Sequence, residues 1–135
     1  MSKIIKIICF LAFVSTSNLA YAVNIATNSD ITFSFTEAVR LIDNTILTNE
    51  NVGSLITLKN TDASGTNLSF TATVNSAKTI ITINPTNNFN SGQIIYAYIG
   101  TTVEDFNDNV IPATSKTFTA EYLVADLTNP LDNED

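Results

Sequence analysis

Histidine and tryptophan are absent from the 135 residues of this chain, and the single cysteine is Cys9. A serine or cysteine nucleophile activated by a neighbouring imidazole is therefore excluded, as is a zinc site built from the usual nitrogen and sulfur ligands. If the segment that carries Cys9 is removed from the chain, no disulfide can form. Stability must then come from packing and hydrogen bonding.

Glycine and basic residues are also scarce. The four glycines form no glycine-rich phosphate loop, which disfavours nucleotide binding. Six Lys and Arg residues stand against thirteen Asp and Glu residues, so the formal net charge is −7. Because nucleic acid and anionic lipid surfaces repel so acidic a chain, the sequence predicts no nucleic-acid partner.

The first 22 residues have the layout of a secretory signal peptide. Lys3 and Lys6 give a positive start, an apolar run covers residues 7–14, and Ala20-Tyr21-Ala22 is an A-x-A cleavage pattern. The apolar run is much shorter than the roughly 20 residues of a membrane-spanning helix. We therefore expect cleavage after Ala22, no transmembrane segment afterwards, and a secreted protein that is extracellular, at the cell surface or in the periplasm.

Cleavage would leave 113 residues, enough for one domain with its own core. Loss of Lys3 and Lys6 leaves four basic residues against thirteen acidic ones, a formal net charge of −9. We expect the domain to span residues 23–123. Residues 124–135 are acidic and have no periodic apolar pattern, which is typical of a tail or linker.

Alternation of apolar and polar residues dominates the chain after residue 22. Residues 30–35 place Ile31, Phe33 and Phe35 on one face of a predicted strand. The same pattern predicts further strands at residues 55–59, 67–74, 78–83, 94–99 and 115–122, of which 67–74 and 78–83 form a hairpin. This pattern predicts an all-β sandwich of about seven short strands, with a small β-barrel as the alternative.

Finer features of packing are also predicted from the pattern. Residues 94–99 are apolar on both faces, which predicts a central strand covered on both sides. Tyr122 is expected to face inward at the end of the last strand. Ile46 and Val52 predict a packed loop, with one helical turn near residues 49–54.

Five segments in order carry motifs of one family. The segments are residues 31–39 (ITFSFTEAV), 79–85 (TIITINP), 89–96 (FNSGQIIY), 103–111 (VEDFNDNVI) and 116–120 (KTFTA). They are similar to the F-S-E-P-V, T-L-T-F-T-P, L-x-x-G-x-x-Y, V-x-D-x-x-G-N-x-L and S-F-T-T motifs of bacterial Ig-like domains found in S-layer and other bacterial surface proteins. The third segment has one extra residue.

The resemblance implies an Ig-like β-sandwich without catalytic residues, acting as a structural or adhesive module of a surface protein. Tyr96 would then form a tyrosine corner, its hydroxyl bonding to backbone upstream. Two positions depart from the family pattern, since Ala38 replaces a proline and Asp108 replaces a glycine. The second position is expected to need a left-handed backbone, which Asp tolerates less well than Gly.

A calcium site is the sharpest chemical hypothesis. Asp105, Asn107 and Asn109 lie at alternate positions and carry the oxygen ligands that Ca²⁺ prefers. An EF-hand is excluded, because Val110 and Lys116 stand where its glycine and bidentate glutamate would be. The alternative is a tight turn in which Asp and Asn side chains cap their own backbone.

The sequence offers two further candidate sites. Tyr98 and Phe106 are possible members of an aromatic sugar-binding face, although aromatic residues at these spacings more often belong to a core. A pair of carboxylates would suit a small hydrolase, but no pocket that raises one pKa can be inferred. Glu37 is expected to bond instead to loop amides or to Arg40.

The combined expectation is a non-catalytic, secreted or cell-surface module that acts as a spacer or docking domain. Its partners would be other surface-protein domains or components of the cell envelope, and it would need no cofactor. A calcium- or carbohydrate-binding module is the alternative, followed by a small hydrolase that uses carboxylates.

Overall fold

The structure, a computed structural model, describes residues 23–122. Both the predicted signal peptide, residues 1–22, and the predicted tail, residues 124–135, lie outside the described residues.

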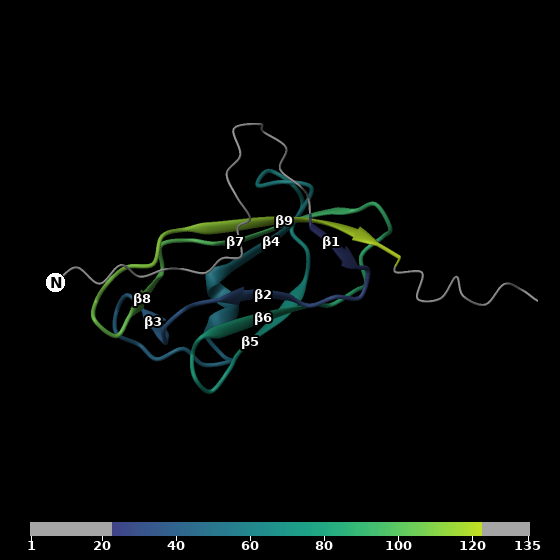
Figure 1. Cartoon of the computed structure of the whole chain (residues 1–135). Helices are drawn as coiled ribbons and strands as arrows, with labels where there is room; N and C mark the ends of the chain where they lie inside the picture. Colours follow the sequence, from purple (N-terminus) through teal and green to yellow (C-terminus); the bar gives the residue numbers. More distant parts are fainter. Residues whose placement is uncertain (1–22, 123–135) are drawn as a thin grey trace, which may run out of the picture.

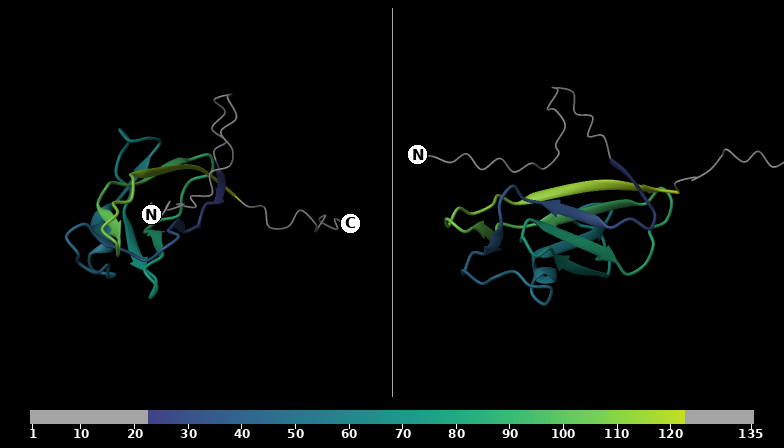
Figure 2. Two further views of the ribbon diagram at one scale, coloured as in Figure 1. Left: turned by 60° about the vertical axis from the view of Figure 1, so that its left-hand side comes forward. Right: turned by 60° about the horizontal axis from the view of Figure 1, so that its bottom comes forward.

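Two β-sheets pack face to face in the described part of the chain (Figure 1). One sheet has the strand order β1 (Val23–Ala26), β9 (Thr114–Glu121), β7 (Ile94–Ile99) and β4 (Ile56–Asn60). The other has the order β2 (Ile31–Ser34), β6 (Ile80–Pro85) and β5 (Phe70–Val74). A two-stranded ribbon of β3 (Val39–Leu41) and β8 (Val103–Asp105) lies at one end of the sandwich, as two further views also show (Figure 2).

Alternating sequence explains the core between the sheets. Ile31 and Phe33 of β2 lie opposite Ile83 and Ile81 of β6, and all four side chains are buried. From the facing sheet, Ile95, Ala97 and Ile99 of β7 point into the same core. Complete burial of each large aliphatic side chain stabilises the fold by about 1.5–3 kcal/mol.

The strand order is that of an Ig-like sandwich. The order β4-β7-β9 corresponds to strands C, F and G of that fold, and β2-β6-β5 corresponds to B, E and D. The first strand, β1, adds to the edge of the C-F-G sheet and runs parallel to β9. The predicted sandwich is confirmed, as is the hairpin of β5 and β6. The barrel alternative is wrong, because the strands form separate sheets.

The described residues form nine strands, whereas about seven were expected. The strands that were not predicted are β1, β3 and β8, which have only three or four residues each. Apolar and polar residues can alternate at most twice in a strand this short. The sequence of each segment alone therefore does not indicate a strand. Each of them is defined by its partner, β9 for β1 and the other strand of the ribbon for β3 and β8.

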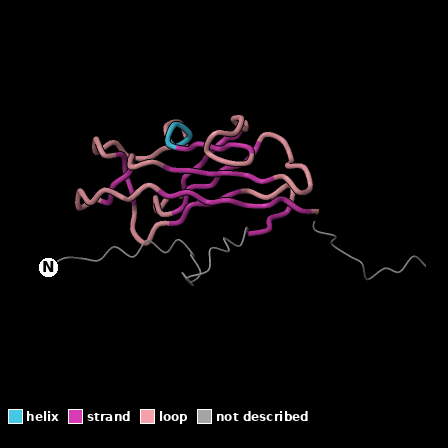
Figure 3. Tube along the Cα trace, turned by 90° about the horizontal axis from the view of Figure 1, so that it is seen from above, coloured by secondary structure: helices cyan, strands magenta, loops and turns pink. Residues whose placement is uncertain are grey.

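The predicted helical turn is confirmed as the short helix η1 (Val52–Leu55), which lies on one side of the strands (Figure 3). Val52 is buried as predicted, but the prediction that Ile46 packs inward is wrong, because Ile46 is 45% exposed. Its neighbour Leu47 is fully buried instead. An isolated bridge pairs Ile46 with Arg40, which places Ile46 on the outer side of the ribbon and turns Leu47 inward.

Two predictions about the C-F-G sheet are wrong. Tyr122 is 71% exposed, because strand pairing ends one residue earlier at Glu121. Strand β7 is central in its sheet as expected, but it is covered on one side only. Its outer face carries Ile94, which is 41% exposed, and the partly exposed Tyr96 and Tyr98. Within residues 23–122, no further layer packs over this face.

The tyrosine corner expected at Tyr96 is also wrong. Because Ile95 and Ala97 point into the core, Tyr96 between them must point outward. Its ring stacks on that of Tyr98, with the ring centroids 6.3 Å apart and the planes 10° from parallel. Among the described residues, its hydroxyl has no backbone partner.

Candidate functional site at the β3–β8 end of the sandwich

The polar residues singled out in the sequence gather where the β3–β8 ribbon meets the loop that follows β8. Pairing of these antiparallel strands sets Arg40 opposite Glu104 and Val39 opposite Asp105. Val39, Val103 and Asp105 face the interior, so Arg40 and Glu104 lie on the outer face of the ribbon.

Asp105 organises the loop through its carboxylate. Its Oδ1 accepts hydrogen bonds from the backbone amides of Asn107 at 2.7 Å and Asn109 at 3.0 Å, and its Oδ2 accepts one from Asn109 Nδ2 at 2.8 Å. The residue is only 1% exposed. The Asn109 side-chain amide, together with the backbone amides of Asn109 and Asn107, holds the pKa of Asp105 below its ordinary value. The carboxylate therefore stays ionised at neutral pH.

The three predicted calcium ligands take part in this arrangement to different extents. Asp105 and Asn109 bond through their side chains, whereas Asn107 bonds to Asp105 through its backbone amide. Both oxygens of Asp105 thus serve the loop itself, as the turn interpretation expects. Within residues 23–122, no three side chains of His, Cys, Asp or Glu gather to hold a metal ion. Calcium binding stays a prediction.

Arg40 pairs with acids that its local sequence does not indicate. Glu37 was expected to bond to loop amides or to Arg40, but Arg40 Nε donates to Glu104 Oε1 at 2.9 Å and its Nη2 donates to Asp108 Oδ1. The Phe106 ring covers the guanidinium, with Cζ 5.2 Å from the ring centroid. The pairing of Arg40 and Glu104 spans 64 positions. Nothing in the local sequence marks it.

Asp108 has the left-handed backbone that was predicted, with φ at 65°. The side chain of Asp108 is 74% exposed and carries the second ion pair of Arg40. The residue that replaces the family's glycine therefore contributes an interaction that glycine would lack.

The two aromatic residues considered for sugar binding lie on different elements. Tyr98 stacks on Tyr96 on the outer face of β7, and Phe106 lies over Arg40 after β8. The stacked aromatic pair found among the described residues is Tyr96 with Tyr98, and Phe106 takes no part in it.

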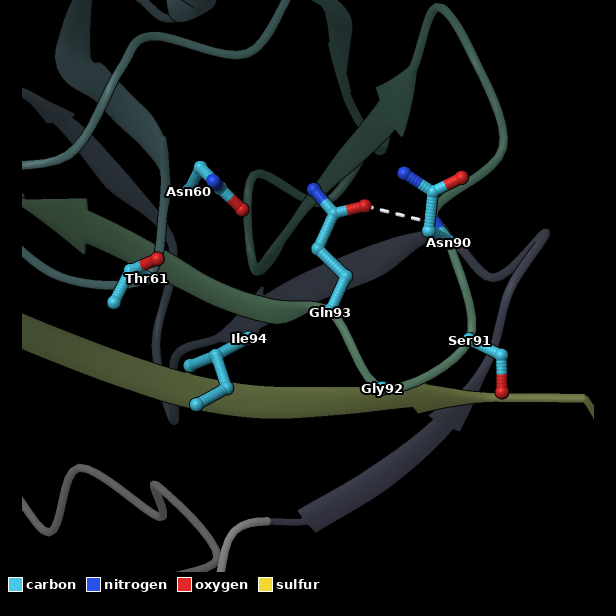
Figure 4. A pocket seen from close by; sticks show the side chains of 7 residues that line it. All are labelled: Asn60, Thr61, Asn90, Ser91, Gly92, Gln93 and Ile94. Atoms are coloured by element: carbon cyan, nitrogen blue, oxygen red, sulfur yellow. Dashed lines mark hydrogen bonds between the residues drawn. The ribbon is translucent and has the colours of Figure 1, made fainter.

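A shallow depression of about 420 Å³ lies near the other end of β7 (Figure 4). Polar neutral side chains line it together with Ile94, and the backbone amide of Asn90 donates to Gln93 Oε1 at 2.8 Å. Its lining contains no carboxylate, so the paired acids that the hydrolase hypothesis requires are not found there.

No helix among the described residues has the length and apolar character needed to cross a membrane. In comparisons with known proteins, the family described as "Bacterial Ig-like domain" matches residues 11–120. This match covers most of the chain, contains the strands β1 to β8 and ends one residue before the end of β9. No curated protein and no solved structure matches the chain significantly.

Proposed function

Because the chain belongs to the bacterial Ig-like domain family, we propose that it is a non-catalytic structural and adhesive module, a spacer or docking domain of a secreted or cell-surface protein. Domains of this family are in general structural rather than enzymatic and occur in surface or extracellular proteins. The expected setting is an S-layer-like envelope, with other surface-protein domains or envelope components as partners.

The parallel pairing of β1 with β9 is the observation that carries the spacer role. Val23 pairs with Phe118, and Ala26 at the other end of β1 pairs with Glu121. A force that pulls residue 23 away from residue 122 acts along both strands in opposite directions. It shears all the bonds between them at once instead of opening them one by one. A domain connected in this way resists stretching, as a spacer in a surface protein must.

Force spectroscopy on residues 23–122, held between handle proteins at both ends, tests this role. The backbone amide of Thr27 donates to Glu121 O at 3.2 Å, just beyond β1. Thr27→Pro removes this donor, whereas Thr27→Ala keeps it. We expect Thr27→Pro to lower the unfolding force and Thr27→Ala to leave it unchanged. Equal unfolding forces for the three proteins would contradict the spacer role.

Export is tested separately with the full chain. We expect the protein expressed in a bacterial host to leave the cytoplasm and to begin at Val23, as measured by fractionation and intact mass. An uncleaved protein that stays in the cytoplasm would contradict a secreted module. A charged residue placed in the apolar run, as in Leu11→Arg, is the matched control and should abolish export.

A further inference from the structure

Four large apolar side chains are exposed together on the outer side of the β3–β8 ribbon. They are Ile42, Ile46, Phe106 and Val110, which are between 45% and 53% exposed and which we call the end patch. They make up half of the eight exposed large apolar residues among those described. Monomeric soluble proteins rarely gather such residues in one place without a function.

Strand register places the end patch on one face. Bridges pair Ile46 with Arg40 and Val110 with Glu104, and Arg40 pairs with Glu104, so these four residues form one row across the ribbon. Ile42 lies two residues after Arg40, and Phe106 lies two residues after Glu104. The ring of Phe106 lies over Arg40 and so shares this face, whereas Ile42 stands in the turn that leads from β3 to Ile46 and borders it.

The end patch covers a charged centre. The side chains of Arg40 and Glu104 are only 14% and 6% exposed, although they point outward from the ribbon. Phe106 lies over the guanidinium, and the two bridges bring Ile46 and Val110 beside the pair. An arginine and an aromatic ring amid aliphatic side chains form the composition that concentrates binding energy in protein interfaces.

Acidic groups border the end patch. Asp108 is exposed beside Phe106, and the exposed Asp43 follows Ile42 directly. The described part of the chain has nine acidic residues and four basic ones. Two copies of so acidic a chain repel each other, so a basic partner fits this border better than a second copy does.

The end patch lies away from the points where the described chain begins and ends. Because β1 pairs with the last residues of β9, residues 23 and 122 lie toward the opposite end of the sandwich (Figure 1). The two views of Figure 2 show the same separation of the ribbon from the end of β9. A domain held through its chain ends therefore presents the end patch outward.

We propose that the end patch docks a protein segment that is apolar along one side and flanked by Lys or Arg residues. This inference rests on the proposed role as a surface module and names its docking face. The apolar side of the segment covers Phe106 and Val110. Its basic residues approach Asp43 and Asp108, so binding weakens as salt screens these charges.

Two synthetic peptides test the docking face. One alternates Lys with Leu and Phe, and the matched peptide has Glu in place of every Lys. Each is titrated into isotopically labelled protein and followed by amide NMR. We expect the Lys peptide to shift amides of residues 40–46 and 103–110, with affinity that falls as salt rises. The Glu peptide should bind at least about tenfold more weakly.

Variants locate the binding. Phe106→Ser and Val110→Thr should each weaken the Lys peptide at least about fivefold, because both remove apolar contact area that the segment covers. Ile94→Thr is the matched control, since Ile94 is also an exposed large apolar residue but lies on the outer face of β7. It should leave the affinity unchanged. Thermal melting of each variant confirms that it is folded.

Several outcomes would overturn the proposal: shifts that cluster away from the ribbon, equal binding of both peptides, or equal affinity of all variants. Self-association in sedimentation that Phe106→Ser abolishes would also overturn it, because the occupant would then be a second copy. None of these outcomes affects the unfolding force or export. Failure of the docking proposal is thus distinct from failure of the proposed function.

Discussion

At the scale of single residues, Asp105 was a candidate calcium ligand, and in the structure its carboxylate accepts hydrogen bonds from the backbone of its own loop. The backbone amides of Asn107 and Asn109 lie beyond the end of β8, and they donate to this carboxylate instead of to a paired strand. An ionised acceptor makes such bonds stronger than a neutral one does. The loop after β8 consequently has a defined shape, which positions Phe106 and Asp108 around Arg40.

Asp105→Asn tests this role through pH. The pKa of Asp105 is lowered in the folded protein, so its charge stabilises the fold above the unfolded pKa of about 4 and ceases to do so as pH falls through the folded value. We expect Asp105→Asn to lower the urea midpoint near neutral pH, because its side-chain amide then faces that of Asn109. The difference from the unchanged protein should shrink near pH 3. A difference that does not depend on pH would contradict the role of the charge.

Asp108→Gly tests whether the strain of the left-handed backbone at Asp108 or its ion pair with Arg40 has the larger effect on stability. Glycine relieves the left-handed backbone at this position, whereas it loses an exposed pair that is worth about 0–1 kcal/mol. We expect a net stabilisation of about 0.5 kcal/mol in urea unfolding. Asp108→Ala keeps the strain and loses the pair, so it should be less stable than the unchanged protein. A lower midpoint for Asp108→Gly would show that the contact with Arg40 outweighs the strain.

At the scale of elements, the segment between β3 and η1 shows that a loop can be a firm part of the core. Leu47 is fully buried although it belongs to no strand. Asn51 holds the segment from the other side, since its Oδ1 accepts from Thr48 N at 2.8 Å and its Nδ2 donates to Ile46 O at 3.0 Å. These bonds turn Leu47 inward and leave Ile46 outside.

Two substitutions in this loop compare the contribution of the buried Leu47 to stability with that of the exposed Ile46. Leu47→Ala should lower the free energy of unfolding by about 3 kcal/mol, because it leaves a cavity in the core. Ile46→Ala, its neighbour and control, should change it by no more than about 0.5 kcal/mol. Urea denaturation measures both. Equal losses would mean that Ile46 packs as tightly as Leu47 does.

At the scale of the whole molecule, the calcium hypothesis predicts an effect on the thermal stability of the domain. A calcium-binding domain melts at a higher temperature with Ca²⁺ than with a chelator, and saturation at about 100 times the dissociation constant adds about 2.7 kcal/mol. Because both oxygens of Asp105 are already bonded within the loop, we expect equal melting temperatures. Scanning calorimetry with Ca²⁺, with Mg²⁺ as control, and with chelator provides the measurement. A rise with Ca²⁺ alone would favour the calcium hypothesis.

Local patterns in the chain were enough to predict the sandwich and the hairpin of β5 and β6, whereas the left-handed Asp108 was expected from the family resemblance. Alternation and turn chemistry act between residues that are close in sequence, so they can be read before the chain folds. The prediction that Ile31 and Phe33 share the inward face of β2 succeeded for the same reason.

Tertiary structure decided the rest. The ribbon of β3 and β8, the pairing of Arg40 with Glu104 and the parallel contact of β1 with β9 each join segments far apart in sequence. Such contacts form only when the folded sheets bring those segments together, and their short sequences carry no sign of the partner. The outward position of Tyr96 has the same origin, since it depends on which neighbouring side chains fill the core.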